Sequence, residues 1–171
     1  MVFGAYVRLT DAGLGCPDWP GCFGTLTVPE SEVAIMEAQG LYPESIVEVG
    51  KAWREMIHRY LAGVLGLMVL LIALLSYRFR NELKVKLILP FSILILITFQ
   101  AALGMWTVTE LLKPAIVTAH LMGGMTTLGL LTYMTHRHIG AVSNTIIINP
   151  GTKPFIRFGL ILLFIQIMLG G

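Results

Sequence analysis

Charged side chains are scarce in this chain of 171 residues: lysine, arginine, aspartate and glutamate together make up 13% of it, whereas they make up about a quarter of an ordinary soluble domain. Hydrophobic residues make up 56%, and the mean hydropathy is +0.78. This composition excludes a typical soluble domain and predicts an all-α integral membrane protein. The net charge is only +2, which also argues against a nucleic-acid-binding surface.

Cysteine is equally rare, with two residues, Cys16 and Cys22, in a polar stretch of the chain. Two prolines and a glycine between them bend the backbone, so that a disulfide bridge is feasible. A metal site would need further cysteine or histidine ligands nearby, and none precedes His58. The pair therefore indicates a disulfide, structural or redox-active, if this stretch faces an oxidising compartment.

Long apolar runs divide the chain, and about 20 such residues suffice to cross a bilayer as a helix. Three runs reach this length, a fourth is still apolar at the last residue, and the first residues read as the end of a helix. We therefore expect a four-helix transmembrane bundle that is truncated at both ends. The expected organisation is the end of a spanning helix at 1–10, a loop at 11–52, spanning helices at 53–76, 87–108 and 115–136 with loops at 77–86 and 109–114 between them, a linker at 137–154 and the start of a further spanning helix at 155–171.

Positive charges in short loops set the orientation of the spanning helices. The loop at 77–86 carries four basic residues against one acid, whereas the loop at 11–52 carries seven acidic residues and one lysine. The first loop and the linker at 137–154 are therefore predicted to be cytoplasmic. The loops at 11–52 and 109–114 then face the outside, where the cysteines can be oxidised.

A short pattern recurs in the apolar segments. Gln100-x-x-Leu103-Gly104 is repeated as Gln166-x-x-Leu169-Gly170, and Phe3-Gly4-Ala5 occupies the corresponding place in the first segment. Repeats of this kind often indicate duplicated units with sites at equivalent positions. Because leucine and glycine are abundant in spanning helices, chance similarity is the alternative explanation.

Two histidines are the main candidates for chemistry inside the membrane. His58 and His120 each lie about five residues inside the outer end of a predicted spanning helix, which places both about 7 to 8 Å below that end. Paired neutral histidines at one level of a helix bundle are typical axial ligands of a haem iron, and the small residues that follow each of them leave room for a flat macrocycle. The alternative is a histidine that hydrogen-bonds across two closely packed helices.

Glu55 precedes His58 by three residues, so both side chains project from one face of the helix. A carboxylate at a porphyrin edge can hold a proton, stabilise positive charge on a substrate or take part covalently. The alternative for Glu55 is an interfacial ion pair with Arg54 or Arg59. These two arginines and Arg8 lie near the outer interface, where they either reach lipid phosphates or contact haem propionates.

Four segments carry specific motifs in a fixed order: VRLTDAGLGCPDWPGC at 7–22, KAWREMIHR at 51–59, QAALGMWTV at 100–108 and TAHL at 118–121. Together they span most of the chain and resemble the signature segments of the haem A synthase family. The resemblance implies eight spanning helices in two related four-helix bundles, each with a histidine pair. It also implies that this chain is the first of the two bundles.

The resemblance further implies oxidation of the C8 methyl of haem O to a formyl group, which makes haem A for cytochrome oxidase. His58 and His120 match the histidine pair that binds haem iron in the first bundle, Glu55 matches the proposed catalytic carboxylate, and a haem b is expected in the second bundle. Because Cys16 and Cys22 match bacterial members, the implied location is the bacterial inner (plasma) membrane, with the cysteine loop extracytoplasmic. The implied partners are haem O, the lipid bilayer, the haem O synthase (a farnesyltransferase) and an electron donor of unspecified kind, with a homo-oligomer as a further option.

Two other functions fit the same residues. A bis-histidine b-type membrane cytochrome that only transfers electrons would need His58 and His120, and Glu55 would be incidental. A haem carrier or assembly protein would bind haem without turnover.

Overall fold

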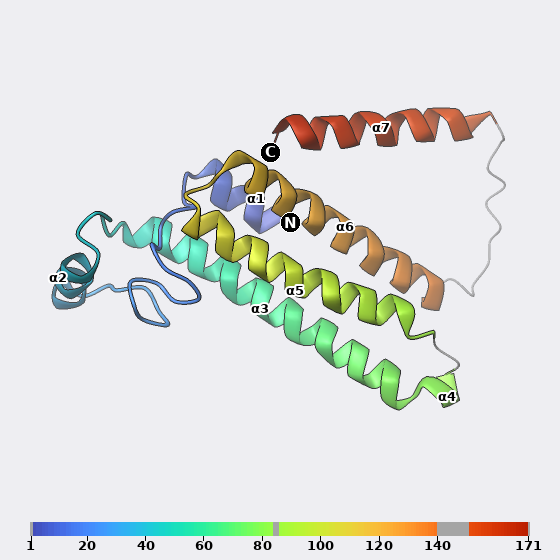
Figure 1. Ribbon diagram of the computed structural model, residues 1–171, viewed down its shortest axis with the longest axis horizontal. Helices are drawn as coiled ribbons and strands as arrows, with labels where there is room; N and C mark the ends of the chain where they lie inside the picture. The colour runs from blue at the N-terminus through green and yellow to red at the C-terminus, as the bar shows by residue number, and fades with distance from the viewer. Residues whose placement is uncertain (1, 84–85, 140–150, 171) are drawn as a thin grey trace.

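The computed structural model describes residues 2–83, 86–139 and 151–170, and within them the chain forms helices and no strands (Figure 1). This confirms the predicted all-α class. The helices are α1 (Val2–Leu9), α2 (Glu32–Leu41), α3 (Val49–Arg78), α4 (Arg80–Leu83), α5 (Ile88–Thr109), α6 (Pro114–Ile139) and α7 (Thr152–Gly170).

Four of these helices, α3, α5, α6 and α7, are long enough and apolar enough to cross a membrane. Large apolar side chains on them are exposed, for example Leu67 and Ile95, as expected for helices whose solvent is lipid. Helix α3 has 30 residues and begins four residues before the predicted span at 53–76, because its first turn contains Gly50 and the charged Lys51 and so does not belong to the apolar run. Much of the predicted linker at 137–154 and one lysine of the loop at 77–86 lie outside the described residues.

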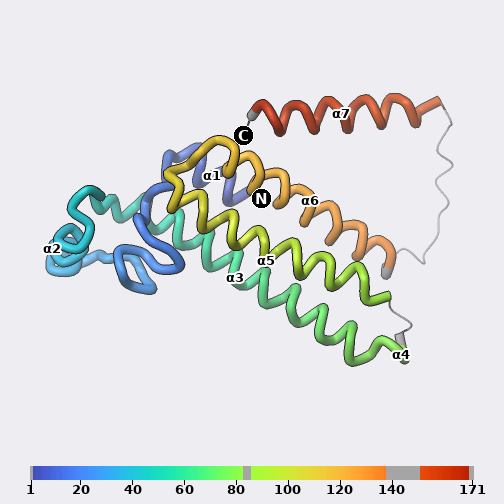
Figure 2. Tube along the Cα trace, viewed as in Figure 1, coloured from blue at the N-terminus to red at the C-terminus, as the bar shows by residue number. Residues whose placement is uncertain are grey.

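Helices α3, α5 and α6 pack side by side in this order (Figure 2). Helix α1 contacts α3, and α7 contacts α6. Helices α3 and α6, which carry the two histidines, lie on either side of α5 and share no close main-chain contact among the described elements. The bundle thus presents His58 and His120 from two helices that a third helix holds apart.

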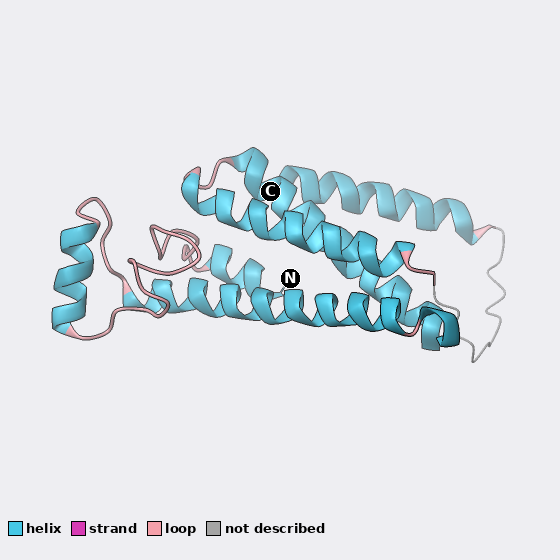
Figure 3. Ribbon diagram, turned by 60° about the horizontal axis from the view of Figure 1, so that its bottom comes forward, coloured by secondary structure: helices cyan, strands magenta, loops and turns pink. Residues whose placement is uncertain are grey.

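The segment between α1 and α3 folds onto the first turns of α3, and α2 stands beyond that end of the bundle (Figure 3). Ser31 caps α2, because its side-chain oxygen accepts a hydrogen bond from the Ala34 amide, one of the amides that a helix start leaves unpaired. Seven buried residues form a small core under this segment: Cys16, Cys22, Phe23, Val28, Ala38, Ala52 and Met56. This core fixes the loop relative to the bundle.

Candidate functional site

Cys16 and Cys22 form the predicted disulfide, with an S–S distance of 2.00 Å. Both are fully buried. Asp18 closes the turn between them, since its carboxylate accepts hydrogen bonds from the amides of Phe23 at 2.6 Å and Gly24 at 2.8 Å. Burial, followed by the neighbouring Asp18 carboxylate, raises the pKa of Tyr42. The structure thus confirms the disulfide and shows a tightly bonded turn around it.

Glu55 is only 4% exposed, and both of its carboxylate oxygens have partners. One oxygen accepts a hydrogen bond from the Cys16 amide at 3.0 Å. The other forms an ion pair with Arg59, one helical turn further along α3. Of the two arginine partners considered from the sequence, Arg59 is the one that the structure brings to Glu55. The carboxylate is therefore fixed between the disulfide loop and its own helix.

Arg59 joins the same loop through the main chain. Its guanidinium donates to the carbonyl of Asp18 at 2.8 Å and to the carbonyl of Gly21, and its side chain is 11% exposed. Planar guanidinium groups suit such multiple contacts because their donors form a fixed fork. The guanidinium of Arg59, one of the three arginines predicted to contact haem propionates, is thus occupied by protein atoms. Of the other two, Arg8 is exposed and Arg54 is half-buried.

Further contacts attach the loop to the start of α3. The Tyr60 hydroxyl donates to the Leu26 carbonyl at 2.6 Å, and the Trp53 indole donates to Glu30 at 2.6 Å. Backbone also packs directly on backbone, because a Cβ placed on Gly15 would lie 2.6 Å from the Lys51 carbonyl carbon. The loop therefore forms a close cap on the end of α3 that carries Glu55.

Each histidine lies against a glycine of a neighbouring helix, His58 against α1 and His120 against α5. A Cβ on Gly4 would lie 3.2 Å from Cε1 of His58, and one on Gly104 would lie 3.4 Å from Cε1 of His120. Phe3 stacks on the His58 ring with centroids 6.4 Å apart. The glycines belong to the short repeated pattern, so the repeat corresponds to a contact that occurs twice in the bundle.

The donor set fits a porphyrin better than a bare metal ion. Among the described residues, no group of three or more histidine, cysteine or acidic side chains could hold a metal. A porphyrin supplies four ligands to its iron and needs two from the protein, which a pair of imidazoles provides.

Gln100 is a site residue to which the sequence analysis assigned no chemistry. It is 7% exposed, and its amide nitrogen Nε2 has no hydrogen-bond partner in the described residues. A Cβ on Gly123 would lie 1.8 Å from that nitrogen. A glutamine in a strongly apolar helix was a visible signal, but its contact with Gly123 depends on how α5 packs on α6.

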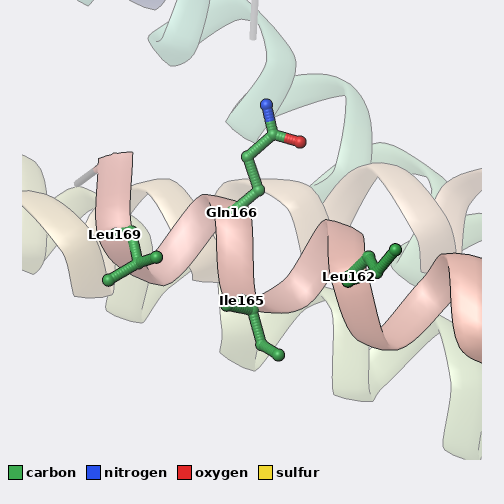
Figure 4. A pocket seen from close by; sticks show the side chains of 4 residues that line it. All are labelled: Leu162, Ile165, Gln166 and Leu169. Atoms are coloured by element: carbon green, nitrogen blue, oxygen red, sulfur yellow. The ribbon is translucent and has the colours of Figure 1, made fainter.

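An open, mostly apolar pocket lies on α7 and is lined by Leu162, Ile165, Gln166 and Leu169 (Figure 4). None of these residues comes from α3 or α6, and Gln166 is its one polar side chain. The pocket therefore lacks the donors for the chemistry above, and we place the candidate site at the histidines.

Comparison with known proteins gives a consistent picture. The profile of a family described as COX15-CtaA, cytochrome oxidase assembly protein, matches residues 1–171. A Heme A synthase of Shewanella oneidensis is 47% identical over 174 residues, covering 100% of this chain and 51% of the relative. A Heme A synthase of Alkalihalophilus pseudofirmus is 29% identical over 121 residues, covering 70% of this chain and 35% of the relative. The chain thus spans about half the length of the first of these relatives, and no solved structure gives a significant match.

Proposed function

The chain belongs to the COX15-CtaA family of cytochrome oxidase assembly proteins, and we propose that it forms the substrate-binding bundle of a haem A synthase in a bacterial inner membrane. The observation that carries this proposal is the histidine pair: His58 and His120 lie on two helices that flank α5, and each ring packs against a glycine of a neighbouring helix. The matching relatives are named Heme A synthase. Their name supplies the product class, and the histidine pair supplies the place where a haem would bind.

In this proposal the substrate is haem O, and its C8 methyl is oxidised to the formyl group of haem A. His58 and His120 would hold the substrate iron as axial ligands, with Gly4 and Gly104 giving each ring a fixed neighbour. The haem supplies the oxidative chemistry, and the protein determines which methyl group is presented.

Glu55 would be the catalytic carboxylate of this site. It lies three residues before His58 on α3, and the Cys16 amide and Arg59 hold its oxygens. A carboxylate fixed in this way is preorganised, because it needs no rearrangement to stabilise positive charge or accept a proton near the substrate. The disulfide loop would then cap the extracytoplasmic end of the site and exclude water from it. A haem b in the remainder of the full-length protein, delivery by a haem O synthase, an electron donor and a homo-oligomer complete the proposal.

A second function is favoured by one observation. Because the contacts of Glu55 with the loop explain its burial without catalysis, a bis-histidine cytochrome that only transfers electrons would keep the same residue for structure. The two functions differ in what happens when the carboxylate loses its charge but the fold is kept.

Glu55→Gln in the full-length protein tests this difference. Glutamine keeps an oxygen that can accept a hydrogen bond from the Cys16 amide, so the loop should stay in place. Glu55→Ala is the comparison variant, because it loses both the negative charge and this hydrogen-bond acceptor. We expect cells with Glu55→Gln to accumulate haem O with haem still bound to the purified protein, measured by pigment extraction and absorption spectra. Unchanged haem A would support the cytochrome. Recovery of haem A by oversupplied haem O in cells without the protein would instead indicate a carrier.

A further inference from the structure

Gln100 places an unpartnered hydrogen-bond donor in the middle of the helix bundle. The side chain is 7% exposed, and Nε2 has no partner among the described residues. Leaving a buried amide donor unpaired costs roughly 1–3 kcal/mol, and water inside a bilayer is too scarce to compensate. Leucine or methionine would fill the same space at no such cost, so the amide needs an explanation other than packing.

The position of the amide relates it to His120. Gly104 of α5 lies against His120, and Gln100, four residues earlier, lies against Gly123, three residues after the histidine. Since α5 and α6 follow each other through a short turn and run in opposite directions, the amide lies about one helical turn, or roughly 5 Å, further from that turn than the imidazole. Gln100 and His120 therefore occupy adjacent levels of one helix interface.

The absence of a Cβ at Gly123 is what allows this arrangement. A methyl group there would lie 1.8 Å from Nε2 and 2.7 Å from Cδ of Gln100, so any other residue would displace the carboxamide. The carboxamide therefore lies one level from the imidazole with an unused donor, which indicates that a ligand completes this interface.

We propose that Gln100 is a positioning residue for the porphyrin substrate, and that its Nε2 donates a hydrogen bond to an oxygen atom on the rim of the ligand held by His120. The inference rests on the proposed function above. Haem O offers two kinds of acceptor, the propionate carboxylates and the hydroxyl of its isoprenoid side chain. An uncharged amide suits a neutral hydroxyl. Gln100 also lies away from the arginines at the loop end of the bundle, which are the expected partners of the propionates, and this favours the hydroxyl as its acceptor. Such a bond would fix the rotation of the ring about the axis through its iron.

The test uses Gln100→Met in the full-length protein, because methionine keeps the unbranched shape and removes the donor. The remainder of the full-length protein is first filled with haem b, haem O and haem b are then titrated separately into the remaining site, and affinity is read from the absorption spectrum. Haem b has the propionates but lacks the hydroxyl. We expect haem O binding to weaken about three- to tenfold, as for the loss of one neutral hydrogen bond, with haem b unchanged. Equal weakening of both haems would identify a propionate as the acceptor.

Two controls separate positioning from packing. Thr127 is 5% exposed, but its hydroxyl already donates to the Gly123 carbonyl at 2.8 Å, so Thr127→Val should leave both affinities unchanged. Gly123→Ala should weaken haem O binding in the wild-type protein and have little effect in a Gln100→Ala background, where the carboxamide is gone. Thermal unfolding of the apo-protein should show Gln100→Met at least as stable as wild type.

The outcomes distinguish this inference from the proposed function. Equal affinities of wild type and Gln100→Met for both haems would overturn the role of Gln100 and leave the histidine site intact. A wild-type protein that binds neither haem would overturn both proposals.

Discussion

Replacing Arg59 by methionine should strongly destabilise the end of α3 that contacts the disulfide loop. Arg59 pairs with Glu55 and also donates to the carbonyls of Asp18 and Gly21. Methionine preserves much of the apolar stem but leaves the Glu55 carboxylate, whose side chain is 6% exposed, with main-chain amides such as that of Cys16 and without an opposite charge. Removing one member of a buried ion pair costs about 3–5 kcal/mol, because the other charge stays buried.

Two assays are used: denaturant unfolding of the detergent-solubilised full-length protein, and, separately, limited proteolysis of the loop at 11–48 in the folded protein. Arg54→Met is the matched control, since Arg54 lies on the same helix end and is half-buried. It should cost less than about 1 kcal/mol, as for an ordinary interfacial arginine. The double variant Glu55→Gln, Arg59→Met should recover part of the loss, because it no longer buries an unpaired charge. If Arg59→Met and Arg54→Met prove equally mild, the loop is not held by this ion pair and our account of the cap is wrong.

Two further substitutions test the close contacts of the site. Gly15→Ala places a methyl group 2.6 Å from the Lys51 carbonyl carbon. Because the backbone cannot rotate away as a side chain can, we expect the free energy of unfolding to fall by about 1–3 kcal/mol in the same assay. An unchanged free energy would mean that the loop does not rest on α3. Gly4→Val brings side-chain atoms onto the His58 ring, since even a Cβ at that position would lie 3.2 Å from Cε1 of the ring. We expect weaker haem binding and an altered absorption spectrum of the purified protein. The control is Ala5→Val, at an exposed position of the same helix, which should change neither.

The sequence allowed the fold class and the disulfide to be predicted well, for physical reasons. Apolar runs of spanning length and a scarcity of charge leave few alternatives to membrane helices, and the structure contains four helices of that kind. Two cysteines six positions apart left one local bridge to form, and it is present. The helix ends were less predictable. Helix α3 begins at Val49, although Gly50 and Lys51 interrupt the apolar run on which the prediction rested.

The site could be predicted only where its contacts are local. The spacing of Glu55 and Arg59 on one helix permits their ion pair, which the sequence analysis left open against Arg54. The contacts of Arg59 with Asp18 and Gly21 join residues about forty positions apart, and no local pattern encodes them. Gln100 was noted as part of a repeat, but its exposure and its missing partner follow from the packing of α5 on α6. The roles of His58, His120 and Glu55 in substrate chemistry stay predictions.

The contacts of Gly4 with His58 and of Gly104 with His120 have a mechanical consequence. Where a ring lies against the bare main chain of a neighbouring helix, its movement toward that helix is limited, so the distance between the helix axes influences its torsion angles. A lateral shift of α1 would therefore turn the His58 ring directly, and a shift of α5 would turn that of His120. The packing of the helices therefore influences the orientation of both histidine rings, and lipid forces that alter the tilt of α1 or α5 would change it.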